Sequence, residues 1–368
     1  MSGTEKSLED RIELPSVPKA VAKKIARAEE EFTRAEVEQL RKSVPVFRPL
    51  FEKRNEIITA PEVADDFWIR VFSNAPSEID EYILPTDAGV LGSCLKNLKV
   101  ERFEVDEKGQ GEPRSIRFTF EFRTGEENPF FENETLVKDF YWRKQVTKTA
   151  KGKRRTWEGL VSEPVRINWK KDMDLTKGLL GTACDLAEAE KKQGGGDRKK
   201  LSEFETLVKK VEEIESDGMK GEDEGDDEEE GLGAQSPAGV SFFAFFGYRG
   251  RDVSAEQSKE ATKESDDRWA KVVKGEKVDD GDSGEEEDDD DYELDEDDLD
   301  DIEIFPDGEE LAIALAEDLW PGALKYYVQS FEIADELDDI EDMDEDEMDD
   351  DEGSDDEASR PNKKARAS

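Results

Sequence analysis

The chain has 368 residues, of which 99 are acidic, 53 are basic and none is histidine, so its formal net charge is −46. This charge repels nucleic acid and anionic membranes and attracts strongly basic proteins, which in a cell are mainly histones and ribosomal proteins. The lack of histidine excludes Ser-His-Asp and Cys-His catalysis and histidine-ligated zinc.

The negative charge is concentrated in the second half of the chain. Residues 1–176 contain 33 acidic and 31 basic residues, whereas residues 177–368 contain the remaining 66 acidic and 22 basic residues. We therefore expect one folded domain that begins in the first half. Much of the second half is too charged and too poor in apolar residues to offset the entropy cost of ordering it.

The sequence shows no sign of a disulfide framework or a membrane segment. Cys94 and Cys184 form no CxxC pair, so we expect two buried or surface thiols in a reducing compartment. No apolar run approaches the roughly 20 residues of a membrane span, and the first residues lack the apolar core of a secretory signal. The sequence predicts a soluble, intracellular protein.

Residues 19–58 predict a long amphipathic helix. Its apolar and small residues recur at spacings of mostly four and three, which is typical of a coiled-coil seam. Forty helical residues span about 60 Å, which exceeds one small domain, so we expect a homodimer, with an internal core helix as the alternative. Pro45 and Pro49 each remove a helical hydrogen bond and predict a kink or break near residues 43–49. The expected dimerisation residues are Val21, Ile25, Ala28, Phe32, Ala35, Val44, Phe47 and Phe51.

A short helical region and four strands are expected next. Residues 62–84 predict the helical region, with a buried face from Phe67 to Phe72. Residues 115–123 alternate most clearly between phenylalanine-rich and polar positions. No helical stretch separates the strands, so we predict an antiparallel meander with one polar face, in an α+β fold. The predicted strands are residues 95–106, 115–123, 135–146 and 163–170.

The second half alternates between charged segments and apolar pieces that return to the domain. Four phenylalanines within Phe242–Phe246 must be buried. Residues 304–328 regain apolar periodicity and predict a helix that ends at Pro321. The expected organisation is a flexible N-terminus (1–17), a long helix (18–59), a domain built from 60–180, 240–252 and 304–334, an inserted charged mobile segment (181–239) with a possible helix at 201–214, an acidic linker (253–303) and an acidic tail with a basic end (335–368).

Six stretches resemble the nucleosome assembly protein family, and most closely its SET (template-activating factor) branch. They are FEKRNEIIT (51–59), FWIRVFSNAP (67–76), FRTGEENPFFENETLVKDF (122–140), INWKKDMDLTKG (167–178), SFFAFF (241–246) and DLWPGALKYY (318–327), in the family's order. The resemblance implies a homodimer paired through the long helix, with a sheet-and-helix "earmuff" domain at each end. Asp65–Asp66 and Gly322–Ala323 depart from the family's usual Pro-Asn and Asn-Pro.

The resemblance implies a histone chaperone without catalytic activity, cofactor or metal. A regulatory scaffold that binds a histone acetyltransferase or a protein phosphatase is the alternative, and a carboxylate-based metal-dependent hydrolase is disfavoured. We expect no specific nucleic-acid binding and no membrane partner. The carboxylates that resemble the family's histone-facing side are Asp307, Glu309, Glu310, Glu317 and Asp318.

Two acidic runs are expected to add histone affinity, with solubilising linkers as the alternative. Glu285–Asp301 holds 14 carboxylates in 17 positions, and Asp335–Glu357 holds 17 in 23. We expect carboxylates to pair with histone Lys and Arg while interspersed apolar residues slow release. A Ca²⁺ or Mg²⁺ site is disfavoured because the EF-hand positions are missing. The expected contacts in the first run are Asp288, Asp289, Asp290, Asp291, Tyr292, Leu294 and Leu299.

Two short basic clusters complete the candidate sites. The loop KGKRR (151–155) suits nucleic acid or an acidic patch of a partner, or is simply solvated. The terminal cluster of Lys363, Lys364 and Arg366 predicts a nuclear import signal, so we expect a nuclear protein that shuttles with the cytoplasm.

Overall fold

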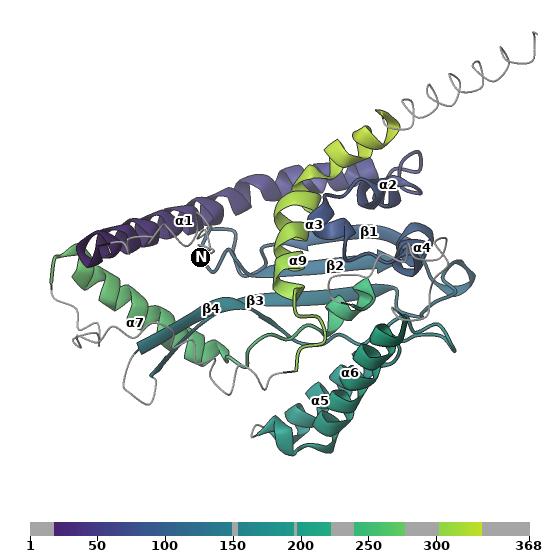
Figure 1. Cartoon of the computed structure of the whole chain (residues 1–368). Coiled ribbons are helices and arrows are strands. Elements are labelled where there is room, and N and C mark those ends of the chain that lie inside the picture. The colour runs from purple at the N-terminus through teal and green to yellow at the C-terminus, as the bar shows by residue number, and fades with distance from the viewer. Residues whose placement is uncertain (1–17, 149–153, 195–196, 222–238, 277–301, 333–368) are drawn as a thin grey trace, which may run out of the picture.

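The computed structural model describes residues 18–148, 154–194, 197–221, 239–276 and 302–332. Within them, a four-stranded sheet lies below a long helix, and further helices pack around the sheet (Figure 1). The fold is α+β, as expected.

The sheet is the predicted antiparallel meander, with strand order β1-β2-β3-β4. The fourth predicted strand was wrong. Residues 163–170 contribute only a bridge between Phe131 and Trp169, because β3 runs further than expected and pairs along its second half with residues 154–162. The pairing of β1 with β2 is irregular between Leu95 and Asn97. The strands are β1 (Leu95–Glu101), β2 (Ile116–Phe122), β3 (Thr135–Lys148) and β4 (Arg154–Ser162).

One face of the sheet is buried and the other is polar. Phe118 and Phe120 of β2 are fully buried, and the short helix η4 (Phe242–Gly247) packs on them. The ring centroids of Phe120 and Phe246 are 5.3 Å apart. Arg117 and the other alternate residues of β2 lie on the opposite, more accessible face. The return of the phenylalanine-rich segment to the core is confirmed.

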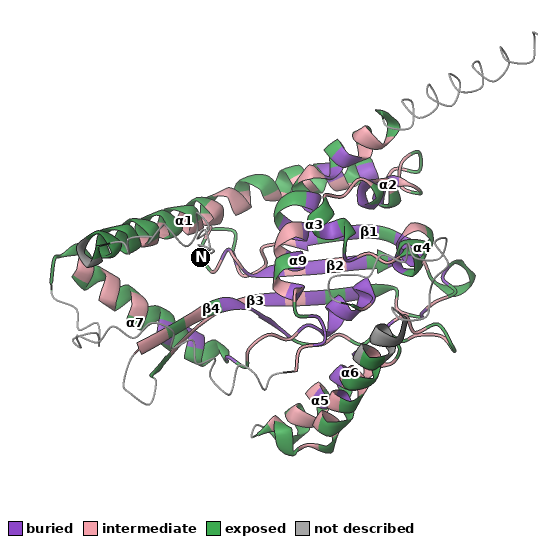
Figure 2. Ribbon diagram, in the orientation of Figure 1, coloured by how far each residue is buried: buried purple, intermediate pink, exposed green. Residues whose placement is uncertain are grey.

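Helix α1 (Lys19–Ile58) is continuous, so the predicted break near residues 43–49 was wrong, although Pro45 and Pro49 lie inside it. Contacts with the domain hold this half of the helix in place. Arg48 Nη2 donates to the carbonyl of Val105 at 3.0 Å, and Arg41 Nε donates to that of Gly111 at 2.9 Å. These contacts offset the two lost helical bonds. Figure 2 shows the first half of α1 to be largely exposed.

Three short helices follow α1. The predicted helical region is confirmed as α2 (Phe67–Ser73) and α3 (Ser77–Asp80), with Phe67 and Trp68 buried. Helix α4 (Pro85–Cys94) was not predicted. Its buried Asp87 accepts hydrogen bonds from the Ser241 hydroxyl and the Phe242 amide, and so joins α4 to η4.

The segment expected to be inserted and mobile contains two packed helices, α5 (Leu179–Gln193) and α6 (Ser202–Gly221). Leu186 and Leu207 are buried between them and the domain, so the folded domain extends beyond residue 180. The possible helix at 201–214 is confirmed as part of α6. Two short helices, η2 (Gly125–Glu127) and η3 (Arg198–Lys200), lie in the connections.

The region expected to be an acidic linker contains helix α7 (Ala255–Val273), which packs on β3. Ser258 and Ala261 are its buried residues. This helix was not predicted because its composition is highly charged. A narrow buried stripe is enough to pack it on the sheet.

The last helical segment does not end at Pro321. Helix α9 (Gly308–Ala314) passes into a π-helical turn, η5 (Leu315–Leu319), and helical structure continues through residues 320–332. The amide of Trp320 donates to Leu315, five residues back. A π-turn shifts the hydrogen-bond pattern, so the missing amide of Pro321 interrupts the helix less than it would in a regular α-helix.

Candidate functional site

Carboxylates of α3 and α9 gather on one surface of the domain. The two helices are in contact. Tyr82 follows α3, and burial together with the charges of Asp307, Glu81 and Glu310 raises the pKa of its hydroxyl to about 12. Carboxylates near residue 80 and near residue 310 therefore act on the same tyrosine hydroxyl.

A second tyrosine extends this surface. The Tyr326 hydroxyl donates to Asp318 Oδ1 at 2.6 Å. Burial, that hydrogen bond and the charges of Asp318 and Glu78 raise its pKa to about 12. We name this surface the α3–α9 acidic face, which consists of Glu78, Glu81, Asp307, Glu310 and Asp318.

The five sequence-predicted carboxylates of the α9 region do not all lie on this face. Glu309 turns inward, and its Oε1 accepts a hydrogen bond from the Leu160 amide at 3.1 Å. Burial raises the pKa of the Glu309 carboxyl. Glu317 pairs with Arg102 at 2.8 Å on the side towards β1. Sequence reasoning missed Glu78 and Glu81, because nothing in the sequence places α3 beside α9.

A groove of about 1100 Å³ lies between α1 and the sheet. Val44, Phe47 and Phe51, three of the predicted dimerisation residues, line it. Trp320 and Trp142 line it from the C-terminal helical segment and from β3. The groove therefore combines a stripe of apolar α1 side chains and two tryptophans with many charged and polar lining residues.

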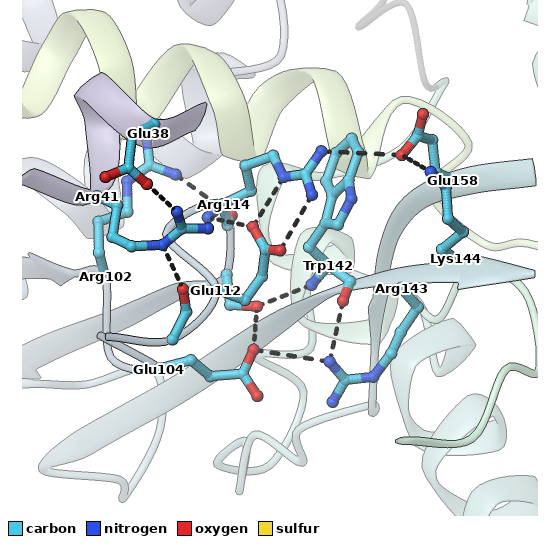
Figure 3. Close-up of polar contacts among 12 residues, drawn as sticks. Glu38, Arg41, Arg102, Glu104, Glu112, Arg114, Trp142, Arg143, Lys144 and Glu158 are labelled. Carbon is cyan, nitrogen blue, oxygen red and sulfur yellow. Dashed lines mark hydrogen bonds and ion pairs between the residues drawn. The ribbon is translucent and has the colours of Figure 1, made fainter. Parts of the chain in front are cut away.

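An ionic network crosses the sheet side of this groove (Figure 3). The guanidinium of Arg114 stacks on Trp142 at 4.3 Å and pairs with Glu112 at 2.7 Å and with Glu158 at 3.8 Å. Lys144 also pairs with Glu158, at 3.5 Å. Basic side chains on this wall thus have acidic partners within the chain.

The seam of α1 is largely uncovered in the single chain. Val21 and Ile25 are 44 % and 45 % exposed, Phe32 is 69 % exposed and Phe47 is 49 % exposed. Ala28 and Ala35 are exposed too, whereas Val44 and Phe51 are half-buried. Large apolar side chains in water favour association with another apolar surface.

The two cysteines and the basic loop lie in ordinary structural surroundings. Cys94 and Cys184 are free and buried, and burial raises the pKa of the Cys184 thiol to about 11, which makes it unreactive. Arg154, from the basic loop, lies in β4 and pairs with Glu264 of α7 at 3.0 Å.

The described residues contain no cluster of three or more acidic or cysteine side chains placed to hold a metal ion. Within the same ranges, no helix is both long and apolar enough to cross a membrane.

The sequence profile of the family described as Nucleosome assembly protein (NAP) matches residues 61–330. This match covers well over half of the chain.

The chain belongs to the NAP family.

Two curated relatives agree with this assignment. A protein of Schizosaccharomyces pombe whose name places it among nucleosome assembly proteins is 36% identical over 146 residues, which are 40% of this chain and 56% of the relative. Protein SET of Drosophila melanogaster is 29% identical over 160 residues, which are 44% of this chain and 48% of that protein. The matched part therefore spans about half the length of these relatives.

Solved structures similar to this NAP-family chain include two of Ccp1. One is 26% identical, with a TM-score of 0.45, and covers 85% of this chain and 96% of the other. A nucleosome assembly protein from Plasmodium falciparum is 18% identical, with a TM-score of 0.26, and covers 53% of this chain and 87% of the other.

Several candidate sites of this NAP-family chain lie outside the described residues. They are Asp288, Asp289, Asp290, Asp291, Tyr292, Leu294 and Leu299 of the first acidic run, the whole second run, and the basic cluster of Lys363, Lys364 and Arg366.

Proposed function

We propose that this chain is a histone chaperone that binds core histones through acidic surfaces and shields their charge during nucleosome assembly and disassembly. The supporting observation is the α3–α9 acidic face, on a NAP-family chain with a net charge of −46. Histones hold DNA through basic side chains set against phosphates, without base-specific contacts. Carboxylates held on a folded surface can occupy those same side chains.

The proposed mechanism is shielding, without a catalytic step. The acidic face binds one histone surface, while the runs at 285–301 and 335–357 cover further basic side chains and raise the association rate. Histones are thereby kept from non-specific sites on DNA and are released where DNA phosphates compete effectively. The basic end of the chain supports a proposed nuclear location.

We also propose that the chaperone is a homodimer paired through α1. The support is the uncovered seam and the groove beside it, which together offer apolar surface to the α1 helix of a second copy. Dimerisation would place two acidic faces on one particle.

The test of the histone proposal is a titration of fluorescent core histone complexes at physiological salt. Neutralising four carboxylates of the face (Glu78→Gln, Glu81→Gln, Glu310→Gln and Asp318→Asn) is expected to weaken binding about 10- to 30-fold. This corresponds to roughly 0.5 kcal/mol for each exposed pair lost.

The matched control neutralises four exposed carboxylates elsewhere (Glu205→Gln, Glu212→Gln, Glu256→Gln and Glu260→Gln). We expect it to bind within about threefold of the parent chain, because these carboxylates lie away from the α3–α9 acidic face and act only through long-range charge, which salt screens. Equal losses in both variants would mean that only net charge matters. No binding by the unaltered chain would refute the histone proposal and favour the scaffold for an acetyltransferase or phosphatase.

A further inference from the structure

Helix α7 reaches from the sheet to the first half of α1, where it meets Arg34 (Figure 1). Arg34 Nη1 pairs with Asp266 Oδ1 of α7 at 2.9 Å, and the guanidinium carbon lies 5.2 Å from the ring centroid of Trp269. Residues 21–33 of α1 are exposed, apart from the half-buried Glu30. Within the described part of the chain, the contact at Arg34 therefore attaches the exposed half of α1 to α7.

The rest of α7 is anchored on β3 and β4. The Ser258 hydroxyl accepts from the Lys144 amide at 3.0 Å, and the Ser265 hydroxyl accepts from the ammonium group of the same lysine at 3.2 Å. Glu264 pairs with Arg154 of β4 at 3.0 Å. Helix α7 therefore connects the two long strands of the sheet to α1.

Arg34 belongs to a row of three arginines along one side of α1. Arg34, Arg41 and Arg48 follow one another at intervals of seven residues, which is close to two helical turns. Arg41 donates to the carbonyl of Gly111, and Arg48 donates to that of Val105. Each arginine of the row thus contacts a part of the chain outside α1.

The row lies on the side of α1 opposite to the exposed seam. Arg34 comes about two and a half turns after Ile25, so the two side chains project in opposite directions. Helix α7 therefore supports α1 from behind and leaves Val21, Ile25 and Phe32 uncovered. The support does not compete with a partner for these apolar side chains.

Two prolines make such support necessary. Pro45 and Pro49 lie inside α1, each removes a helical hydrogen bond, and prolines are the commonest sites of sharp helix kinks. Arg34 and Arg41 lie before the prolines, in the half of α1 that would otherwise swing. A bend of about 20° at the prolines would move a residue roughly 20 positions away by about 10 Å.

We infer that α7 is a strut that acts through Arg34 to hold the two halves of α1 in line across Pro45 and Pro49. The contact is partly exposed, with Arg34 at 32 % and Asp266 at 59 %, so it can open while the domain stays folded. In the proposed homodimer the strut fixes the direction in which each domain leaves the paired helices. That consequence rests on the homodimer proposal, whereas the strut itself lies within one chain.

The experiment measures the direction of α1 relative to the sheet. Spin labels are attached to the full chain at Lys24→Cys in the first half of α1 and at Lys96→Cys on β1, two exposed positions. Cys94 and Cys184 are buried and stay unlabelled. The labelled chain is incubated with excess unlabelled chain, so that a dimer contains one labelled copy. Pulsed electron paramagnetic resonance then gives the distance between the two labels.

We expect one narrow distance for the parent chain. Arg34→Gln, and separately Asp266→Asn combined with Trp269→Ala, should each shift or broaden this distance by up to about 10 Å, because α1 then bends at its prolines. The matched control is Arg27→Gln. It also removes an ion pair within α1, with Glu31 at 3.1 Å, but leaves the contact with α7 in place, so the distance should stay unchanged.

Unchanged narrow distances in both strut variants would overturn the inference, and so would a parent distance as broad as theirs. An equal change with Arg27→Gln would also overturn it, because the effect would then come from lost ion pairs within α1. Sedimentation of the same samples gives the mass and tests the homodimer proposal separately.

Discussion

Lys138 projects from β3 into the core, where its ammonium group donates hydrogen bonds to three backbone carbonyls. The acceptors are Glu163, Phe246 and Tyr248, at 2.8, 3.1 and 2.6 Å. Nearby, Glu303 accepts hydrogen bonds from the amides of Arg249 and Gly250. These two side chains join β3, the segment after β4, and both ends of the insertion that carries α7.

Lys138 should make the stability of the fold depend on pH. Burial lowers the pKa of Lys138 from 10.5 to about 7, so between these values the unfolded chain binds more protons than the folded chain. Stability from this group therefore rises with pH above about 7, by roughly 2–3 kcal/mol between pH 7 and 9. Urea unfolding at both pH values measures this increase.

The matched variant is Lys138→Met, which fills the space without a titrating group. We expect its free energy of unfolding to change little between pH 7 and 9. An equal increase in the variant and the parent chain would assign the pH effect to other residues.

At the scale of elements, α7 protects an open sheet edge. Strand β3 continues past Phe140, the last residue that β2 pairs with, and its further amides on that edge need acceptors. The hydroxyl of Ser115 accepts from the Trp142 amide at 2.9 Å, and that of Ser258 in α7 accepts from the Lys144 amide at 3.0 Å. A helix of charged composition therefore has a defined structural role.

Ser258→Ala should lower the free energy of unfolding by about 1–2 kcal/mol, because it leaves the partly buried Lys144 amide without this acceptor. The control is Thr262→Ala, since among the described residues that hydroxyl donates within α7, to the Ser258 carbonyl. Denaturant unfolding gives both values, and hydrogen exchange at Lys144 should accelerate only in the first variant. Equal stability of the two variants would contradict the proposed edge protection.

The whole molecule combines a nearly neutral first half with a strongly acidic second half. The proposed chaperone thus has two kinds of proposed histone contact, the α3–α9 acidic face and the two acidic runs. We expect the runs to act mainly through long-range charge, which salt screens with a length of about 8 Å at physiological ionic strength.

Ending the chain after Ala334 is expected to reduce the association rate with core histones about tenfold and to flatten its salt dependence, while binding itself persists. Stopped-flow fluorescence at several salt concentrations measures both effects. Complete loss of binding in the truncated chain would mean that the folded domain holds no histone site of its own.

The sequence by itself determined the long helix, the meander, the buried phenylalanine segment and the family. These features depend on local periodicity and on short motifs, which neighbouring residues specify. The strand at 154–162 was missed because Lys and Arg near its start suggested a loop, whereas pairing with the long β3 made it a strand. Helix α7 was missed because few of its residues are apolar, and α5 was missed because the charged residues that follow its apolar first half suggested a mobile segment.

Tertiary structure alone decided which charges act together. Glu78 and Asp318 act on the same Tyr326 hydroxyl because α3 packs against α9. Glu309 turns inward, where it accepts a hydrogen bond from the Leu160 amide. Arg54 is buried because Trp320 covers its guanidinium. The environment of a charged side chain depends on contacts between residues far apart in the sequence, and those contacts exist only once the chain is folded.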